Sequence, residues 1–202
     1  MALTIIHTAD LHGHLDRRGA DALRFLAEQT GALLLDSGDA IAAGNVYVRA
    51  REPVLELMNA AGYDAMAVGN REFFFRKSGL LRKTGQACFP VLATNVLALS
   101  GDLGHVLRWT VLDVGGQRVG MFGLAPTMIA PASFAERFSD LRFITWEGAA
   151  VEAVEAVHDD AEWLVALSHR GLEDDRALAK LCPQIDAILG GHSHDACTEL
   201  VG

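Results

Sequence analysis

The sequence predicts an α/β fold, and three observations support this prediction. First, short apolar runs rich in Val, Ile, Leu and Ala recur along the chain, which is typical of strands buried on both faces. Second, amphipathic, helix-like stretches separate several of these runs. Third, polar residues stand directly after the runs, as they do where parallel strands end at a ligand-binding edge. A chain of 202 residues can enclose a hydrophobic core without disulfides, so we expect one domain over residues 1–202.

Six of the apolar runs are expected to be strands. In chain order they are LTIIH (3–7), ALLLD (32–36), DAMAV (64–68), PVLAT (90–94), WLVALS (163–168) and DAILG (186–190). A seventh region, 105–124, differs, because two extended runs flank Gly115-Gly116, a dipeptide that suits a tight hairpin turn. We therefore expect an antiparallel pair within an otherwise α/β pattern.

Two stretches show the features of helices most clearly. Residues 20–29 (ADALRFLAEQ) place Leu23, Leu26 and Ala27 on one face. Residues 173–181 (EDDRALAKL) begin with three acidic residues and have Lys180 near the end, which complements the helix dipole, and Pro183 lies just beyond. Both stretches stand beside predicted strands, as in α/β units.

Charge and composition exclude several classes of function. Lys and Arg number 17 against 26 Asp and Glu, for a net charge of −9, which argues against binding a nucleic-acid polymer or an anionic membrane. The three cysteines include no CxxC pair, so we expect buried thiols rather than disulfides or a zinc site. The start MALTII lacks the features of a leader peptide, and no apolar run is long enough to span a bilayer. We expect a cytoplasmic protein.

Seven polar residues follow the predicted strands, at their carboxyl ends. They are Asp10, His12, Asp39, Asn70, His169, His192 and His194. A single His or Asn in such a position is more often an ordinary loop residue, but seven together predict a site. The pairs Asp10 with His12 and His192 with His194 are spaced two apart, so each pair projects from one side of an extended segment. Glycines that allow sharp turns and close approach stand beside them at 38, 69, 190 and 191.

The ligand types indicate transition metals. Carboxylate, amide and imidazole donors without a thiolate suit manganese, iron or zinc better than magnesium or calcium, which prefer oxygen ligands only. If one carboxylate bridges, the set can hold two ions and still leave positions open for water and substrate.

The order of short motifs DLH, GD, GN, SH and GHSH resembles the calcineurin-like metallophosphoesterases. The segments HTADLHGHL, LSHRGLEDDRALA and ILGGHSH are most similar to the N-terminal catalytic domain of bacterial 5′-nucleotidases, and the resemblance spans nearly the whole chain. It implies a four-layer α/β/β/α sandwich, in which helices flank two mixed sheets. It also implies two divalent transition metal ions, Mn²⁺ first and Fe, Zn, Co or Ni as alternatives. One ion would be held by Asp10, His12, Asp39 and His194, and the other by Asp39, Asn70, His169 and His192.

The sequence departs from the family's pattern at one catalytic motif. The family commonly has Asn-His-Glu followed two residues later by Asp, where the histidine assists the leaving group and the aspartate orients it. Here Arg71 and Phe74 occupy the histidine and aspartate positions. We expect Asn70 and Arg71 to contact the substrate, and His14 to be the remaining substrate-binding residue or acid. The alternative is that Arg71 only forms a surface ion pair with Glu72.

The neighbouring phenylalanines carry separate expectations. Phe73 and Phe75 are expected in the core. For Phe74 two alternatives stay open: it lies in the core, or it borders the substrate.

The sequence therefore predicts a metal-dependent phosphoesterase that hydrolyses phosphomonoesters or phosphodiesters of small molecules through a metal-bound hydroxide, with Asp39, Asn70 and Arg71 as catalytic residues. One alternative is a 5′-nucleotidase or 2′,3′-cyclic-nucleotide phosphodiesterase whose C-terminal substrate-binding domain is missing from residues 1–202. A second is a metal-binding pseudophosphatase that acts as a protein-binding module. The expected partner is a small phosphorylated substrate, and the oligomeric state is left open.

Overall fold

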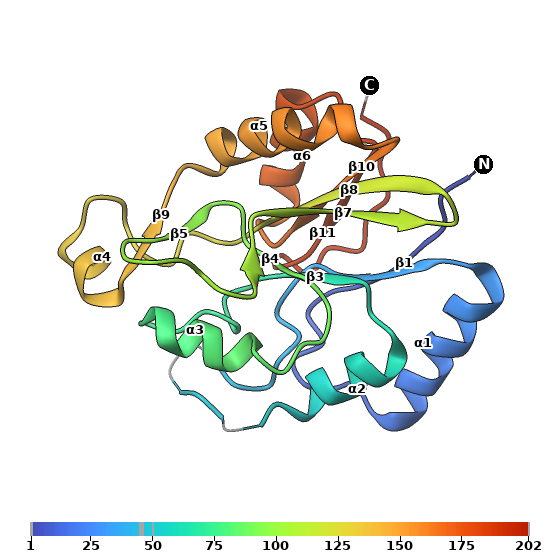
Figure 1. Ribbon diagram of the computed structural model, residues 1–202, viewed down its shortest axis with the longest axis horizontal. Coiled ribbons are helices and arrows are strands. Elements are labelled where there is room, and N and C mark those ends of the chain that lie inside the picture. The colour runs from blue at the N-terminus through green and yellow to red at the C-terminus, as the bar shows by residue number, and fades with distance from the viewer. Residues whose placement is uncertain (1, 45–46, 50, 202) are drawn as a thin grey trace.

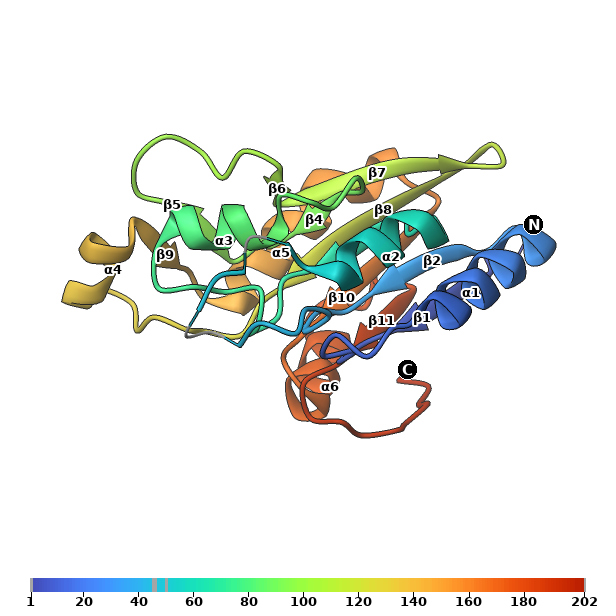
Figure 2. The ribbon, with the colours of Figure 1, turned by 90° about the horizontal axis from the view of Figure 1, so that it is seen from below.

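The structure is a computed structural model that describes residues 2–44, 47–49 and 51–201. Its elements form four layers, helices, sheet, sheet and helices, which confirms the predicted α/β/β/α sandwich (Figure 1). Helices α1 (Arg17–Thr30), α2 (Pro53–Ala61) and α3 (Lys77–Thr84) lie on the outer side of the first sheet, and Figure 2 shows them from that side. Helices α5 (Trp146–Val157) and α6 (Leu172–Leu181) cover the second sheet.

The described strands of the first sheet are all parallel, so this sheet is not mixed as the resemblance implied. Its strands lie in the order β1 (Ile5–Thr8), β2 (Leu33–Asp36), β3 (Ala65–Ala67), β4 (Val91–Leu92) and β6 (Val106–Leu107). Each neighbouring pair runs in the same direction, with Thr8 opposite Asp36 and Asp36 opposite Met66. Four of the predicted strands are therefore confirmed here, and their carboxyl ends share one edge.

The second sheet is mixed. Its order is β11 (Ala187–Gly190), β10 (Trp163–Ser168), β8 (Gln117–Leu124) and β7 (Trp109–Val114). Strand β10 runs parallel to both β11 and β8, whereas β7 is antiparallel to β8. The turn between β7 and β8 has positive φ at Gly115 (60°) and Gly116 (84°), the backbone that a two-residue hairpin favours. The predicted hairpin is therefore confirmed.

A smaller unit lies beside the sandwich. It contains the antiparallel pair β5 (Val96–Ala98) and β9 (Leu141–Phe143) with the short helix α4 (Phe134–Ser139) between them in sequence. A 3₁₀ turn, η1 (His158–Asp160), follows α5.

Both predicted helices form, and their ends have identifiable causes. Helix α1 starts after Asp16, whose side chain accepts a hydrogen bond from the Gly19 amide at 2.7 Å, and it ends at Gly31 with φ of 64°. Helix α6 carries acidic residues in its first turn and Lys180 in its last, as predicted.

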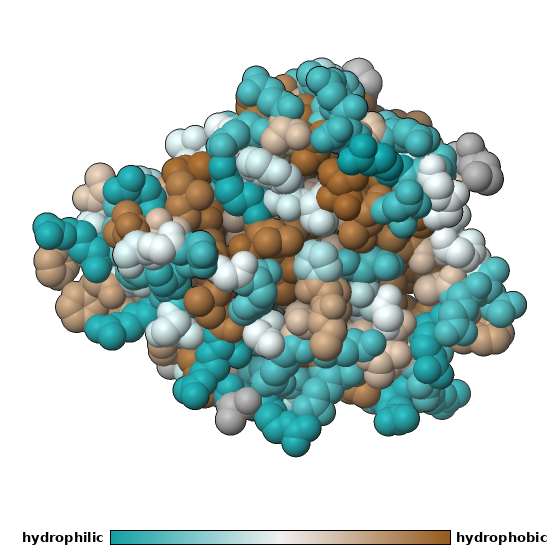
Figure 3. All heavy atoms as spheres, viewed as in Figure 1, coloured by the Kyte–Doolittle hydropathy of each residue, from teal (hydrophilic) through white to brown (hydrophobic). Residues whose placement is uncertain are grey.

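Apolar side chains fill the three spaces between the four layers. Successive residues of a strand point to opposite faces, so Leu34 of β2 packs toward the helices and Leu35 packs between the sheets. In the same way, Met121 of β8 lies between the sheets and Phe122 lies under α5. This explains why the strands read as continuous apolar runs. In Figure 3 the outer helices are largely hydrophilic, and apolar residues gather over the strands between them.

Several burial predictions were wrong. Phe75 is 45% exposed, because the chain turns outward just before α3, and its ring lies 6.0 Å from that of Phe138 on α4. Cys182 is buried beneath α6 as expected, but Cys88 and Cys197 lie in exposed segments. In the part of the chain that the structure describes, no helix is long and apolar enough to cross a membrane.

Candidate metal centre

The seven predicted site residues lie in loops that leave the carboxyl ends of five strands. Asp10 and His12 follow β1, Asp39 follows β2, and Asn70 follows β3. From the second sheet, His169 follows β10, and the pair His192 and His194 follows β11. The first two loops continue to pair beyond their strands, because the amides of Asp10 and His12 donate to the carbonyls of Gly38 and Asp39 at 3.0 and 2.9 Å. A further bond joins the two sheets, from the His192 amide to Asp10 Oδ2 at 2.9 Å.

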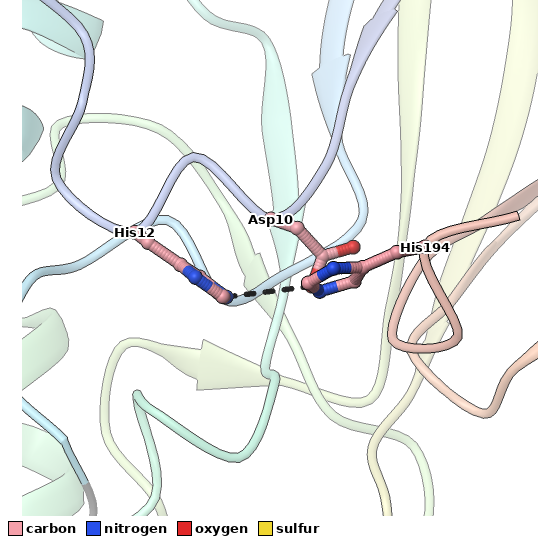
Figure 4. A group of neighbouring side chains, drawn as sticks. All are labelled: Asp10, His12 and His194. Atoms are coloured by element: carbon pink, nitrogen blue, oxygen red, sulfur yellow. Dashed lines mark ion pairs between the residues drawn. The ribbon is translucent and has the colours of Figure 1, made fainter. Parts of the chain in front are cut away.

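One group of possible ligands consists of Asp10, His12 and His194. Their donor atoms all lie within 4.8 Å of one another. His12 Nε2 is 3.6 Å from Asp10 Oδ1, and His194 Nε2 is 3.3 Å from the same oxygen. Figure 4 shows the three side chains pointing toward one another from the N-terminal and C-terminal loops. This arrangement can hold one cation.

A second group, with donor atoms equally close, contains Asp10, Asp39 and His169. His169 Nε2 lies 3.5 Å from Asp39 Oδ1 and 3.8 Å from Asp10 Oδ1. The other oxygen of Asp39, Oδ2, is 3.4 Å from His12 Nε2 in the first group. The two oxygens of Asp39 therefore face histidines of different groups, which is the geometry that a bridging carboxylate requires.

Asn70 and His192 complete the set. His192 Nδ1 lies 3.2 Å from Asn70 Oδ1, and its ring centroid is 5.0 Å from that of His169. All seven residues predicted from the sequence thus come together at one place.

The backbone around these residues is strained. Within the described ranges, seven residues other than glycine have positive φ, and five of them belong to the set: Asp10, His12, Asp39, His192 and His194. Such conformations cost free energy and persist where the surroundings impose them, often at functional sites. Their concentration here indicates that the loops are shaped to direct side chains toward a common point.

The hydrogen bonds leave ligand atoms free for a cation. His169 Nδ1 donates to the carbonyl of Ser37 at 2.8 Å, so its Nε2 faces the two aspartates. In the described part of the chain, Asp10 Oδ1, His12 Nε2 and His169 Nε2 are buried without a hydrogen-bond partner. Buried polar atoms are nearly always paired, so three unpaired donor atoms in one cluster fit a bound metal ion.

The electrostatics of the cluster also favour positive charge. Burial acts to raise the pKa of Asp39, but the nearby imidazole of His169 and the hydrogen bond from the Arg71 amide outweigh burial, and the pKa lies below its ordinary value. Burial acts to lower the pKa of His169, but the same contact with Asp39 raises it. The pair thus stabilises an added positive charge at this position.

Glu72 lies beneath the site and makes no ion pair with Arg71. It is completely buried, and its carboxylate accepts hydrogen bonds from the amides of Asp39, Ile41 and Gly69 at 2.9, 3.2 and 2.8 Å. Burial, followed by repulsion from Asp39, raises the pKa of Glu72. The alternative of a surface ion pair between Arg71 and Glu72 is therefore wrong.

Arg71 instead faces the cluster. Its amide donates to Asp39 Oδ1 at 2.6 Å, its Nε lies 3.7 Å from Asp39 Oδ2, and its Nη1 donates to the carbonyl of Ala42 at 3.2 Å. The side chain keeps 29% of its surface exposed, so it borders both the cluster and solvent.

The remaining residues around the site are placed as follows. Phe73 is buried, as predicted, whereas Phe74 is half-buried with its ring against α3. His14 is exposed, and among the described residues its side chain makes no hydrogen bond or ion pair with the cluster. Gly69 must be glycine for space: a Cβ there would lie 2.4 Å from both the amide nitrogen and Oδ1 of Asp39.

Two supporting residues were missed by sequence reasoning. Ser37 orients His169 through its carbonyl, and its hydroxyl donates to the carbonyl of Leu189 on β11. Glu72 organises the loops after β2 and β3. Neither role can be read from the local sequence. Every residue has a backbone carbonyl, so the role of Ser37 leaves no pattern, and the burial of Glu72 depends on segments distant in the sequence.

Comparison with known proteins gives a family match over nearly the whole chain. The family model described as calcineurin-like phosphoesterase matches residues 3–196. Protein UshA of Yersinia enterocolitica is 30% identical over 96% of this chain and 40% of its own length. Snake venom 5′-nucleotidase of Gloydius brevicauda is 28% identical over 95% of this chain and 37% of its own length. The chain thus spans about two fifths of these curated relatives.

Solved structures give the same result. The crystal structure of a 5′-nucleotidase precursor from Thermus thermophilus matches with a TM-score of 0.80 and 28% identity, over 98% of this chain and 43% of that one. The calcineurin-like phosphoesterase YfkN of Bacillus subtilis shares the fold, with a TM-score of 0.74 and 22% identity over 96% of this chain and 72% of that one.

Proposed function

The chain belongs to the calcineurin-like phosphoesterase family, and from this premise we propose that it hydrolyses phosphoesters of small molecules with two divalent metal ions. The observation that carries the proposal is the cluster of seven possible ligands, in which Asp10 Oδ1, His12 Nε2 and His169 Nε2 are buried and unpaired. Buried polar atoms without a partner cost free energy, so these atoms support bound metal ions. A metal-binding pseudophosphatase would hold the same ions, and the activity screen described below distinguishes it from an enzyme.

We assign the ligands to two sites. Asp10, His12, Asp39 and His194 would hold one ion, and Asp39, Asn70, His169 and His192 the other. The distances from Asp39 Oδ2 to His12 and from Asp39 Oδ1 to His169 support Asp39 as the bridge. The mixed oxygen and nitrogen donors favour a transition metal, and manganese is our first expectation.

The metal ions, when bound, activate water as the nucleophile and neutralise negative charge on the phosphoryl group. Residues of the chain would bind the phosphoryl oxygens directly. Asn70 carries no charge, so its amide can donate a hydrogen bond to a phosphoryl oxygen without repelling it. Arg71 offers a planar pair of N–H donors, which suits two phosphoryl oxygens. His14 is kept as a candidate for contact with the outer part of the substrate.

The names of the relatives suggest nucleotides as the substrate class. Curated relatives at 28–30% identity carry the name 5′-nucleotidase, and so does the Thermus structure. We therefore propose phosphomonoesters, nucleoside monophosphates included, as the first substrates to test, and phosphodiesters second. Phosphodiesterase activity, manganese as the metal and a cytoplasmic location stay predictions.

The test is an activity screen of protein loaded with Mn²⁺, Zn²⁺ or Fe²⁺. Substrates are p-nitrophenyl phosphate, bis-p-nitrophenyl phosphate and several nucleoside monophosphates. His169→Asn should lose at least roughly a hundredfold in kcat, because it removes a buried ligand. His158→Asn, an exposed histidine in η1, is the matched control and should retain wild-type activity. Equal activity of the two variants, or no hydrolysis with any metal, would overturn the proposal.

A further inference from the structure

A lysine ammonium lies buried beside the site and is fully hydrogen-bonded. Lys83 of α3 is completely buried, and its Nζ donates to the carbonyls of Gly44, Arg71 and Phe73 at 2.8, 2.7 and 3.0 Å. A buried ammonium is costly unless its protons are paired. Here three N–H groups donate to three backbone carbonyls, so each donor of the ammonium has an acceptor.

The three carbonyls belong to two segments that border the candidate metal centre. Gly44 lies in the segment after Asp39, and Arg71 and Phe73 lie in the turn after Asn70. Arg71 Nη1 also donates to the carbonyl of Ala42. The segment after Asp39 and the turn after Asn70 are therefore connected both through Lys83 and through the Arg71 side chain. With its amide on Asp39 Oδ1, Arg71 is held at its amide, its carbonyl and its guanidinium.

The side chain of Phe74 packs between the ammonium and helix α3. The ring of Phe74 lies with its centroid 5.6 Å from Lys83 Nζ, within reach of a cation–π contact. On the other side, a Cβ at Gly79 would lie 2.1 Å from Phe74 Cδ1, so the ring occupies the space that a side chain would need. Phe74, Gly79 and Lys83 therefore form one packed unit.

Charged groups around Lys83 come from several elements. Glu72, Glu52 and Asp39 stabilise the ammonium, whereas Arg71 opposes it. Burial is the largest influence, and it lowers the pKa of Lys83 to about 8. Near neutral pH the group is thus mainly the three-donor ammonium that the geometry requires.

We propose that Lys83 is a positioning residue: it clamps the turn after Asn70 to the segment after Asp39, so that the Arg71 guanidinium is presented to the phosphoryl group. The proposal rests on the proposed function for the role of Arg71. Lys83 acts through Arg71 and touches neither metal nor substrate.

Lys83→Met tests the clamp, because it keeps the length of the side chain and removes its donors. Lys77→Met is the matched control on the same helix, where Lys77 pairs with Asp140. We expect Lys83→Met to lower kcat for p-nitrophenyl phosphate by roughly tenfold to a hundredfold, the usual effect of a small misplacement. Metal content should equal that of wild type. The losses from Lys83→Met and Arg71→Ala should not add, because both remove the same contact.

A measurement on the wild type keeps the proposal testable if Lys83→Met does not fold. Ammonium protons that bond three carbonyls exchange slowly, so a ¹⁵N NMR spectrum near pH 6 should show the Lys83 ammonium. In protein labelled with ¹⁵N at lysine, cross-peaks between the ammonium and the ring protons of Phe74 assign the signal. A wild-type spectrum without a slowly exchanging ammonium overturns the clamp, and so does a folded Lys83→Met with the activity of Lys77→Met. Wild type that shows the ammonium but hydrolyses no phosphoester instead contradicts the proposed function.

Discussion

Arg71 brings a positive charge to the edge of the candidate metal centre, 3.7 Å from Asp39 Oδ2, and keeps part of its side chain open to solvent. It stands where the family's motif carries a histidine. A guanidinium does not release its proton near neutral pH, so it can stabilise charge but cannot protonate a leaving group. The enzyme should therefore depend on leaving groups that depart without a proton.

Arg71→Ala should lower turnover of p-nitrophenyl phosphate by roughly tenfold to a thousandfold, the scale of one lost transition-state contact. Metal content should stay unchanged, because Arg71 is not a ligand. The wild type should also hydrolyse aryl phosphates much faster than alkyl phosphates of the same charge. Steady-state kinetics on both substrate series check this. If Arg71→Ala turns over aryl phosphates as fast as wild type, Arg71 is only a surface charge.

Among single residues, the sequence predicts the seven that the loops bring together but not the residues that support them. Asp39 and His169 could be found because each follows an apolar run typical of a buried strand. Glu72 could not, because its burial depends on amides from two separate loops. The exposure of Phe75 could not be predicted for a related reason. Phe73 is buried, but Phe75 lies just before α3, and its exposure depends on the path of the chain there.

Among the elements, the ends of β2 and β3 approach each other so closely that one glycine decides the geometry of the site. The amides of Asp39 and Gly69 share one carboxylate oxygen of Glu72. No room is left between the two backbones for a methyl group at position 69.

Gly69→Ala should displace Asp39 and reduce both metal content and kcat, the latter by roughly a hundredfold or more. Gly19→Ala on α1 is the control, since a Cβ at position 19 would meet only side-chain atoms of Leu15 and Asp16 among the described residues, at 3.2 and 3.3 Å. Elemental analysis and kinetics on the two variants measure the difference. Wild-type metal content in a folded Gly69→Ala would show that the close approach does not position the ligand.

The predicted elements share one property, which is a strong local pattern. Strands such as β10 and the hairpin β7–β8 have apolar runs or turn residues that specify them. The three-residue strands β5 and β9 were not predicted, because they are too short for a pattern and pair across more than forty residues.

For the molecule as a whole, a buried acid makes stability depend on pH. Asp36 at the end of β2 accepts hydrogen bonds from the Thr8 hydroxyl and the Gly38 amide, and Thr8 also bonds the hydroxyl of Tyr63. Burial raises the pKa of Asp36 from an ordinary 3.8 to about 8. Between these values the unfolded chain releases the proton and the folded chain keeps it. Stability therefore falls as pH rises through this window, by at most about 1.4 kcal/mol per pH unit.

Asp36→Asn should remove this dependence, because an amide does not ionise and its oxygen can still accept from Gly38. Compared with wild type, the variant should gain stability between pH 5 and pH 7.5. Urea unfolding of chelator-treated protein at both pH values measures the change. Parallel pH curves for wild type and Asp36→Asn would contradict a raised pKa.

The four-layer arrangement itself could be predicted only through resemblance. Apolar runs at 32–36 and 163–168 look alike in the sequence, yet β2 and β10 lie in different sheets. The choice of sheet depends on long-range packing between Leu35, Met121 and Leu167, which no local pattern contains.

We propose that seven residues from both sheets form one dinuclear metal centre. Metal content per chain, measured by elemental analysis after loading with Mn²⁺ and removal of free metal, tests it most directly. We expect two ions per chain in wild type and a marked loss in Asp39→Ala, because Asp39 would serve both sites. A wild-type content that stays below one ion per chain with every transition metal tried, or an Asp39→Ala variant that binds as much as wild type, would contradict it.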